Sequence, residues 1–230
     1  MDTIDRDLKK ILYENGASLV GFADLKSIVQ NDLMFGVSVG VAVPPQVIQA
    51  IENGPTMDYF NEYHRINKLL DHIVTVGAAF LNEKGYEAHA QTNGTVVESD
   101  DYRTALPHKT VATRAGLGWI GKSALFVSTE FGSAVRLSSL VTNAKLQCAA
   151  PVDDSRCGNC MACTDACPGK AISGKRWNVN TDRDDFFNPI DCRKAARALA
   201  AKHINQEITL CGKCIWVCPY TQKYLHSAGF

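Results

Sequence analysis

The first two thirds of the chain contain two stretches in which hydrophobic residues recur every three or four positions. Residues 3–16 place Leu8 and Leu12 at helical spacing, and a glycine ends the stretch. Residues 58–85 repeat the pattern over a longer span that ends at Gly85. Because a repeat of 3.6 residues gathers these side chains on one face, we predict amphipathic helices in both ranges, the second being the longest of the chain.

Short hydrophobic runs separate and follow these stretches. The valine-rich run at 36–45 ends in two prolines, which is typical of a buried strand. We predict strands within 17–25, 36–45 and 86–92, and two strands around a Glu-Phe-Gly turn, as a hairpin, within 124–143. This alternation of helices and strands favours an α+β fold that begins with an α/β module containing a mixed sheet.

Composition narrows the class of protein. The formal net charge of the 230 residues is zero, which gives no reason to expect a surface for polyanions. The first residues are charged rather than apolar, and no apolar run is long enough to span a membrane. We therefore expect a cytoplasmic protein, in which the nine cysteines are metal ligands or catalytic groups rather than disulfides.

Eight of these cysteines lie in the C-terminal third of the chain. Residues 157–168 read C-x2-C-x2-C-x3-C-P, residues 211–219 read C-x2-C-x3-C-P, and Cys192 lies between them. In bacterial ferredoxins that bind two 4Fe–4S clusters, the fourth cysteine of such a motif binds the other cluster. We predict an α/β domain over residues 1–150 and a ferredoxin-like domain over 151–230.

Counting the cysteines assigns eight of them to two clusters. The second motif supplies only two ligands to its own cluster, so Cys192, at the start of an alanine-rich helix predicted at 189–202, completes that set. The predicted ligands are Cys157, Cys160, Cys163 and Cys218 for the first cluster, and Cys167, Cys192, Cys211 and Cys214 for the second. Cys148 is left over, and we interpret it as a buried residue.

A zinc site is the alternative to two clusters. The C-x2-C pairs that begin at residues 157 and 211 could together hold one zinc ion through four thiolates. That arrangement would leave four cysteines without a role, namely Cys163, Cys167, Cys192 and Cys218. We therefore favour the two clusters.

The segment "RAGLGWIGK", residues 114–122, is the other dense signal. Gly116, Gly118 and Gly121 match the G-x-G-x-x-G pattern of dinucleotide-binding loops, but the acidic residue expected further on is not well placed. The segment also fits a tight turn that packs Trp119 into the core, or a backbone that approaches a large flat cofactor closely. These three interpretations stay open.

The segment "RAGLGWIGK", the cysteine motifs and the N-terminal "GASLVGFADL" together resemble the epoxyqueuosine reductase family. Its members are cobalamin-dependent iron–sulfur enzymes, related in their redox core to reductive dehalogenases. The resemblance implies an N-terminal module that holds cobalamin and a ferredoxin-like domain that holds two 4Fe–4S clusters, with the ligands assigned above. It also implies that the corrin is contacted by Arg114, Gly116, Leu117, Gly118, Trp119, Ile120, Gly121 and Lys122.

The chain departs from this family in two respects. Family members that act on tRNA carry a C-terminal helical-repeat region, whereas this chain ends soon after Cys218, and its neutral charge argues against tRNA as a partner. Ungapped counting also puts Tyr102 where the family has a catalytic aspartate. The candidate proton donors are therefore Asp101, Tyr102 and His108, although "ESDD" also reads as a solvated loop and His108 as a structural residue.

Two classes of function follow from these observations. The first is a reductive enzyme, in which a low-potential donor such as ferredoxin or flavodoxin supplies electrons through the clusters to a bound cobamide. The second is an electron-transfer or corrinoid-handling protein that serves a partner enzyme and has no organic substrate of its own. A further alternative places FMN in the N-terminal module, because related α/β folds hold flavins. None of these interpretations requires a membrane.

Overall fold

A four-stranded sheet with strand order β1-β2-β6-β3 lies in the N-terminal part of the protein, in a computed structural model that describes residues 3–230. Its strands are β1 (Leu19–Asp24), β2 (Phe35–Ala42), β3 (Ala88–Gln91) and β6 (Val135–Thr142). The β1–β2 and β3–β6 pairings are both antiparallel. Seven consecutive residues of β2 are buried, which explains its unbroken hydrophobic run.

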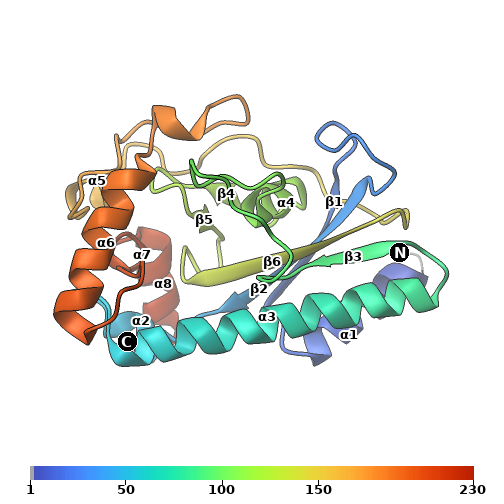
Figure 1. Cartoon of the computed structure of the whole chain (residues 1–230), viewed down its shortest axis with the longest axis horizontal. Coiled ribbons are helices and arrows are strands. Elements are labelled where there is room, and N and C mark those ends of the chain that lie inside the picture. The colour runs from blue at the N-terminus through green and yellow to red at the C-terminus, as the bar shows by residue number, and fades with distance from the viewer. Residues whose placement is uncertain (1–2) are drawn as a thin grey trace. The chain divides into compact units, whose positions relative to one another are not determined.

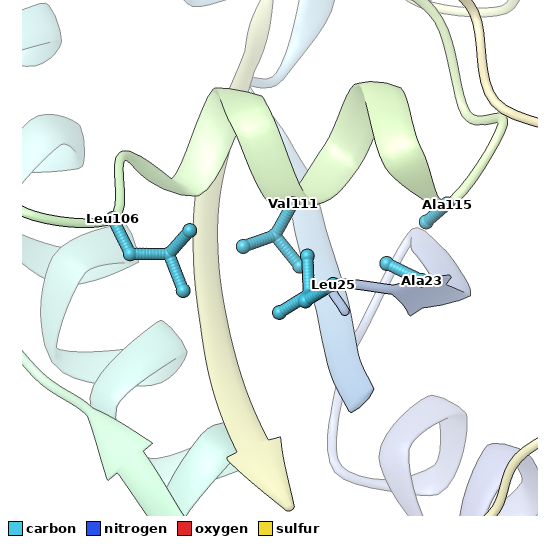
Figure 2. Packing of buried hydrophobic residues seen from close by; sticks show 5 residues of the cluster. All are labelled: Ala23, Leu25, Leu106, Val111 and Ala115. Atoms are coloured by element: carbon cyan, nitrogen blue, oxygen red, sulfur yellow. The ribbon is translucent and has the colours of Figure 1, made fainter. Parts of the chain in front are cut away.

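Helices cover both faces of this sheet (Figure 1). Helix α1 (Thr3–Glu14) and the second part of α3 (Met57–Glu83) pack on one face. There, a β-carbon on Gly77 of α3 would lie only 2.9 Å from side-chain atoms of Leu12 and Leu140. On the other face, the short helix α4 (His108–Arg114) packs Val111 against residues of and after β1 (Figure 2).

A second group of elements surrounds the cysteines. It includes α2 (Pro45–Gln49), β4 (Trp119–Ile120) and β5 (Phe126–Val127), α5 (Ala162–Asp165), the 3₁₀ helix η1 (Arg183–Asp185), α6 (Pro189–Ile204), α7 (Lys213–Trp216) and α8 (Pro219–Ser227). The Tyr224 hydroxyl of α8 donates to the carbonyl of Val43 at 3.1 Å. The backbone N–H of Ser133 donates to Oγ1 of Thr221 at 3.1 Å. Segments that precede the cysteine motifs in sequence are therefore built into this group.

The chain accordingly divides into two compact units that are not contiguous in sequence. The first contains Met1–Val41, Arg65–Gly118 and Arg136–Val152, and the second contains Ala42–His64, Trp119–Val135 and Asp153–Phe230. The predicted division into 1–150 and 151–230 lies close to only one of the boundaries between these units, the one between Val152 and Asp153. The reason is that the cysteine segment forms mostly short helices, so residues 42–64 and 119–135 supply much of the apolar surface against which it packs.

The helices and strands predicted in the first 92 residues are confirmed, as is the helix predicted at 189–202. The hairpin predicted within 124–143 is wrong, because β5 pairs with β4 and β6 joins the four-stranded sheet. An isolated bridge between Ser128 and Gly132 turns the chain between β5 and β6 instead. Within residues 3–230, no helix combines the length and hydrophobicity that a membrane crossing requires.

Candidate metal centres

Four predicted ligands of the first cluster line one cavity of the second unit. The cavity encloses about 430 Å³, including space open to solvent. Residues 119–127 form one of its walls and the two cysteine motifs form the others. The cysteines that line it are Cys157, Cys160, Cys163, Cys214 and Cys218. The structure thus brings Cys218 of the second motif to the three leading cysteines of the first.

The predicted ligands of the second cluster line another cavity of the same unit. It encloses about 470 Å³, again including open space, and Ile172 and Phe187 contribute to its apolar wall. Its cysteines are Cys167, Cys192, Cys211 and Cys214. Because Cys214 and Ser123 line both cavities, the two cavities are adjacent.

Short turns and helix ends position these side chains. The N–H of Cys160 donates to the carbonyl of Cys157 at 3.1 Å, which closes the tight turn that the first motif requires. Cys192 lies in the first turn of α6, where the Asn188 side chain caps the helix by accepting from the N–H groups of Ile190 and Asp191. Cys218 immediately precedes α8, which begins at Pro219.

Burial raises the pKa of thiols in both cavities. The pKa values of Cys163 and Cys192 are each raised to about 11, with burial as the largest cause and nearby cysteines adding to it. These neighbours are Cys157, Cys218 and Cys160 for Cys163, and Cys167 and Cys211 for Cys192. Burial is also the main cause of the raised pKa of Cys214. The neighbours of Cys163 belong to the first predicted ligand set and those of Cys192 to the second, whereas cysteines of both sets raise the pKa of Cys214.

Each cavity gathers at least four thiols around one partly open space. Among residues 3–230, no group of three or more His, Cys, Asp or Glu side chains is arranged to hold a metal ion directly. A 4Fe–4S cluster, unlike a single ion, takes its four thiolates at separate corners, and the lining of each cavity supplies these four thiols.

Cys148 lies outside these cavities, in the first unit. It lines a separate pocket with Asp5 and Phe22, and its thiol lies 3.4 Å from the carbonyl oxygen of Leu146, to which it donates. Burial is the first cause that raises the pKa of Cys148, to about 11, and Asp24 and Asp5 add to it. Cys148 is half-buried rather than buried, and it lines neither of the two cysteine cavities.

The segment 114–122 divides between the two units after Gly118. In the first unit, the Arg114 guanidinium donates to the carbonyl of Val152 at 2.9 Å, and Gly116 adopts a φ of +70° on the surface. In the second unit, Trp119 is completely buried, as the interpretation of a tight turn packed into the core predicts. Ile120 is buried beside it in β4.

Gly121 and Lys122 line the first cysteine cavity. A β-carbon on Gly121 would lie 3.0 Å from Val127 and 3.6 Å from Sγ of Cys157, so the backbone passes close to the cavity. The Lys122 ammonium donates to the carbonyl of Cys160 at 2.8 Å. The sequence singled out Lys122 as a cofactor contact, and its partner in the structure is a predicted cluster ligand.

Asp101 and Tyr102 lie in an exposed loop of the first unit. The Asp101 carboxylate accepts a short hydrogen bond from the Ser99 hydroxyl and lies 3.0 Å from Nε of Arg103. Tyr102 is 37% exposed and has a φ of +61°, a left-handed conformation that side chains adopt only at a cost. The Asp101 carboxylate is thus paired with Arg103 within its own loop.

His108 begins α4 and is held by a chain of two hydrogen bonds. Its Nδ1 lies 2.8 Å from Oγ of Ser139, and that hydroxyl donates to Oε1 of Gln91 at 2.6 Å. Because Ser139 uses its proton toward Gln91, its oxygen accepts from Nδ1–H of His108. Burial lowers the pKa of His108, while Asp71 raises it and Arg136 lowers it. Ser139 and Gln91 were not predicted, because only the pairing of β3 with β6 brings them together.

The chain matches known iron–sulfur proteins in sequence. Residues 156–221 match the family described as a 4Fe-4S double cluster binding domain. Epoxyqueuosine reductase of Lactococcus garvieae is 37% identical over 122 residues, which are 51% of this chain and 33% of that protein. The enzyme of Synechocystis is 33% identical over 120 residues, 52% of this chain and 41% of that one. The chain thus spans between a third and half of the length of these relatives.

Solved structures share the fold. A catabolic reductive dehalogenase in complex with 3-bromo-4-hydroxybenzoic acid superposes with a TM-score of 0.71 at 17% identity, over 93% of this chain and 31% of that chain. A crystal structure of epoxyqueuosine reductase gives 0.64 at 18% identity, over 94% of this chain and 65% of that chain. At these identities the likeness establishes the fold alone.

Proposed function

Because this chain is a relative of the epoxyqueuosine reductases and carries a 4Fe–4S double cluster binding domain, we propose that it is an iron–sulfur oxidoreductase that transfers single electrons through two clusters. The observation that carries the proposal is the pair of adjacent cavities, each lined by at least four cysteines. Two clusters held side by side form a short path for electrons.

In the proposed assignment, each cysteine motif supplies one ligand to the cluster of the other motif. Cys218 of the second motif completes the cluster of Cys157, Cys160 and Cys163, and Cys167 of the first motif completes the other. Cys192, Cys211 and Cys214 supply the remaining three ligands of the second cluster. The lining of both cavities and the neighbours that raise the thiol pKa values support this assignment.

We further propose a cobamide as the electron acceptor in the first unit. A neighbour of the same fold is described as a reductive dehalogenase whose structure suggests a mechanism for B12-dependent dehalogenation. Gly116 is exposed and Arg114 and Leu117 are half-buried, so this part of the segment fits an added group better than the buried residues 118–122. When bound, a cobamide would supply a low-potential cobalt centre. The relatives described above give no support to FMN.

Among the candidate proton donors, Tyr102 fits the role best. The Asp101 carboxylate is paired with Arg103, and the lowered pKa of His108 keeps its imidazole neutral, with Nδ1–H directed to Ser139. The Tyr102 hydroxyl is a hydrogen-bond donor, and its side chain is partly exposed. We propose ferredoxin or flavodoxin as the class of electron donor.

The second candidate function is electron transfer to a partner enzyme, without an organic substrate for this chain. Both functions require the clusters. They differ in whether the chain binds a cobamide and turns over a substrate by itself.

Metal analysis after anaerobic purification tests the proposal directly. We expect about eight irons per chain after reconstitution with iron and sulfide, and one cobalt when cobalamin is supplied. A low-potential reductant should then bleach the cluster absorption and change the corrinoid spectrum. Zinc in place of iron would overturn the clusters, whereas eight irons without cobalt binding would favour the electron-transfer protein.

A further inference from the structure

Lys122 places a buried positive charge beside the first cysteine cavity. The side chain is only 3% exposed and lines the cavity together with Cys157 and Cys163. Its Nζ donates to the carbonyl of Cys160 at 2.8 Å and lies 3.5 Å from Sδ of Met161. A lysine buried to this extent is rare unless a negative charge lies close to it.

The position of Lys122 is fixed by the turn that follows β4. The N–H of Gly121 donates to the carbonyl of Leu125 at 2.8 Å, and the N–H of Ala124 donates to the carbonyl of Gly121 at 2.9 Å. Just before this turn, Trp119 is completely buried against Tyr220. The ammonium is therefore held against the cavity by the backbone and the core rather than by a flexible loop.

The charge of Lys122 needs compensation that its own contacts do not supply. Taking an ammonium group out of water costs several kcal/mol unless opposite charge or hydrogen bonds replace the water. Within residues 3–230, the hydrogen-bond partners of its Nζ are the Cys160 carbonyl and the Met161 thioether, both of which are uncharged. Four thiolates on a cluster in the same cavity would supply the missing negative charge.

We propose that Lys122 is the counter-charge of the cluster held by Cys157, Cys160, Cys163 and Cys218, and that it raises the reduction potential of that cluster. The inference rests on the proposed ligand assignment. The step is the transfer of one electron from a donor, which is oxidised, to the cluster, which gains one negative charge. The Lys122 ammonium stabilises the more negative, reduced form of the cluster through the low-dielectric interior.

Lys213 provides a matched control at the other cavity. It lines the second cavity between Cys211 and Cys214, but it is only half-buried and its Nζ donates to the carbonyl of Glu52 at 2.6 Å, on the exposed surface. Solvent and salt screen an exposed charge much more strongly than a buried one. We therefore expect Lys213 to affect the second cluster much less than Lys122 affects the first.

The test compares the reduction potentials of the two clusters in the reconstituted full chain. Lys122→Met, Lys122→Arg and Lys213→Met are titrated anaerobically and followed by low-temperature EPR, with iron per chain measured first. We expect Lys122→Met to lower the equilibrium constant for reduction of one cluster at least about tenfold, which corresponds to a fall of about 59 mV in a one-electron reduction potential. The equilibrium constant for reduction of the other cluster should change by no more than about twofold. Lys122→Arg should stay close to the wild-type value.

The outcomes separate this inference from the proposed function. Fewer than about eight irons in the wild-type chain would overturn the ligand assignment and the inference with it. Full iron with both potentials unchanged in Lys122→Met would overturn the role of Lys122 alone, as would an equally large effect of Lys213→Met. If Lys122→Met loses iron, Lys122→Gln takes its place, because glutamine keeps a donor for the Cys160 carbonyl without the charge. Unchanged potentials of both clusters in Lys122→Gln would then overturn the role of Lys122.

Discussion

The indole ring of Trp119 packs edge to face against the ring of Tyr220, with their centroids 4.8 Å apart and their planes at 74°. The Arg156 guanidinium lies over the indole, 5.6 Å from its centroid. Tyr220 follows the proposed ligand Cys218 by two residues and lines the first cavity. The aromatic pair therefore connects β4 to the segment that contains the proposed exchanged ligand of the first cluster.

Removing this ring should destabilise the second unit. Trp119→Ala is expected to cost about 3–5 kcal/mol, because it leaves a cavity in a completely buried position. Trp119→Phe keeps an edge-to-face contact, leaves a smaller cavity and removes Nε1, which within residues 3–230 is buried without a hydrogen-bond partner, so it should cost less than Trp119→Ala. Anaerobic thermal unfolding measures both. Equal losses in the two variants would contradict the packing role.

The lowered pKa of His108 predicts a pH-dependent stability. Because its pKa in the folded state lies below the unfolded value of about 6.5, the unfolded state binds more protons as the solution is acidified. The contribution of His108 to stability is therefore fully present above that value and is lost as the pH falls below it toward the folded pKa. The glutamine of His108→Gln cannot bind a proton in this pH range. As the pH falls, the unfolding temperature of the variant should therefore decrease less than that of the wild type.

The matched control for this prediction is His89→Gln. His89 is 60% exposed and pairs with Glu87 at 2.9 Å, so it has no comparable burial to oppose protonation. Unfolding is followed from about pH 8 to about pH 5.5, the range in which a histidine with an ordinary pKa changes charge. A difference between His108→Gln and the wild type that stays constant over this range would sink the prediction.

Two glycines with nearly the same backbone conformation should respond very differently to alanine. Gly132 has a φ of +57° and Gly158 a φ of +53°. A β-carbon on Gly132 would lie 2.2 Å from the backbone nitrogen of Thr221 in α8, whereas one on Gly158 would meet no atom within 4 Å. Gly158→Ala should cost only the left-handed strain of about 1–2 kcal/mol.

Gly132→Ala should cost more, on the order of 3 kcal/mol or above, because the backbone of α8 must move. That movement would also displace Cys218, which immediately precedes α8, so the variant should lose iron from the first cluster. Iron analysis and thermal unfolding of the two variants check this. If Gly158→Ala is destabilised as much as Gly132→Ala, the close approach of α8 is not what restricts residue 132.

Local patterns were sufficient to predict the longer helices and strands and the chemistry of the cysteines. The repeat through α3 and the valine run of β2 report directly on burial, and the motif spacing reports on a turn that bends around a cluster. The pairing of β5 was not predictable in this way, because two-residue strands such as β4 leave no periodic signal. The division into two non-contiguous units was not predictable from local patterns either, because it depends on contacts between residues far apart in the sequence.

The same limit applies within the site. Lys122 stands out in the sequence, but nothing in its neighbourhood indicates that its ammonium meets the carbonyl of Cys160, 38 residues further on. His108 was selected as an ionisable residue, yet its burial and its bond to Ser139 arise from the packing of α4 on the sheet. Spacing predicts which residues carry chemistry, and tertiary packing decides what they touch.

The exchange of ligands between the motifs predicts that single cysteine variants fall into two spectroscopic classes. Cys218→Ala should give the same EPR spectrum as Cys157→Ala, because both would lack a ligand of the first cluster. Cys167→Ala should match Cys192→Ala, which lacks a ligand of the second. Each variant should lose up to about four of eight irons. If each motif held its own cluster, Cys218→Ala would instead match Cys192→Ala.

Cys148→Ala is the control for this series. Cys148 lies in the first unit, and its raised pKa, about 11, comes first from burial and then from the charges of Asp24 and Asp5 rather than from another cysteine. We expect this variant to retain about eight irons and the wild-type EPR spectrum. Loss of iron from Cys148→Ala equal to that from Cys218→Ala would mean that cysteine removal disturbs the chain generally, and the two-class assignment would then fail.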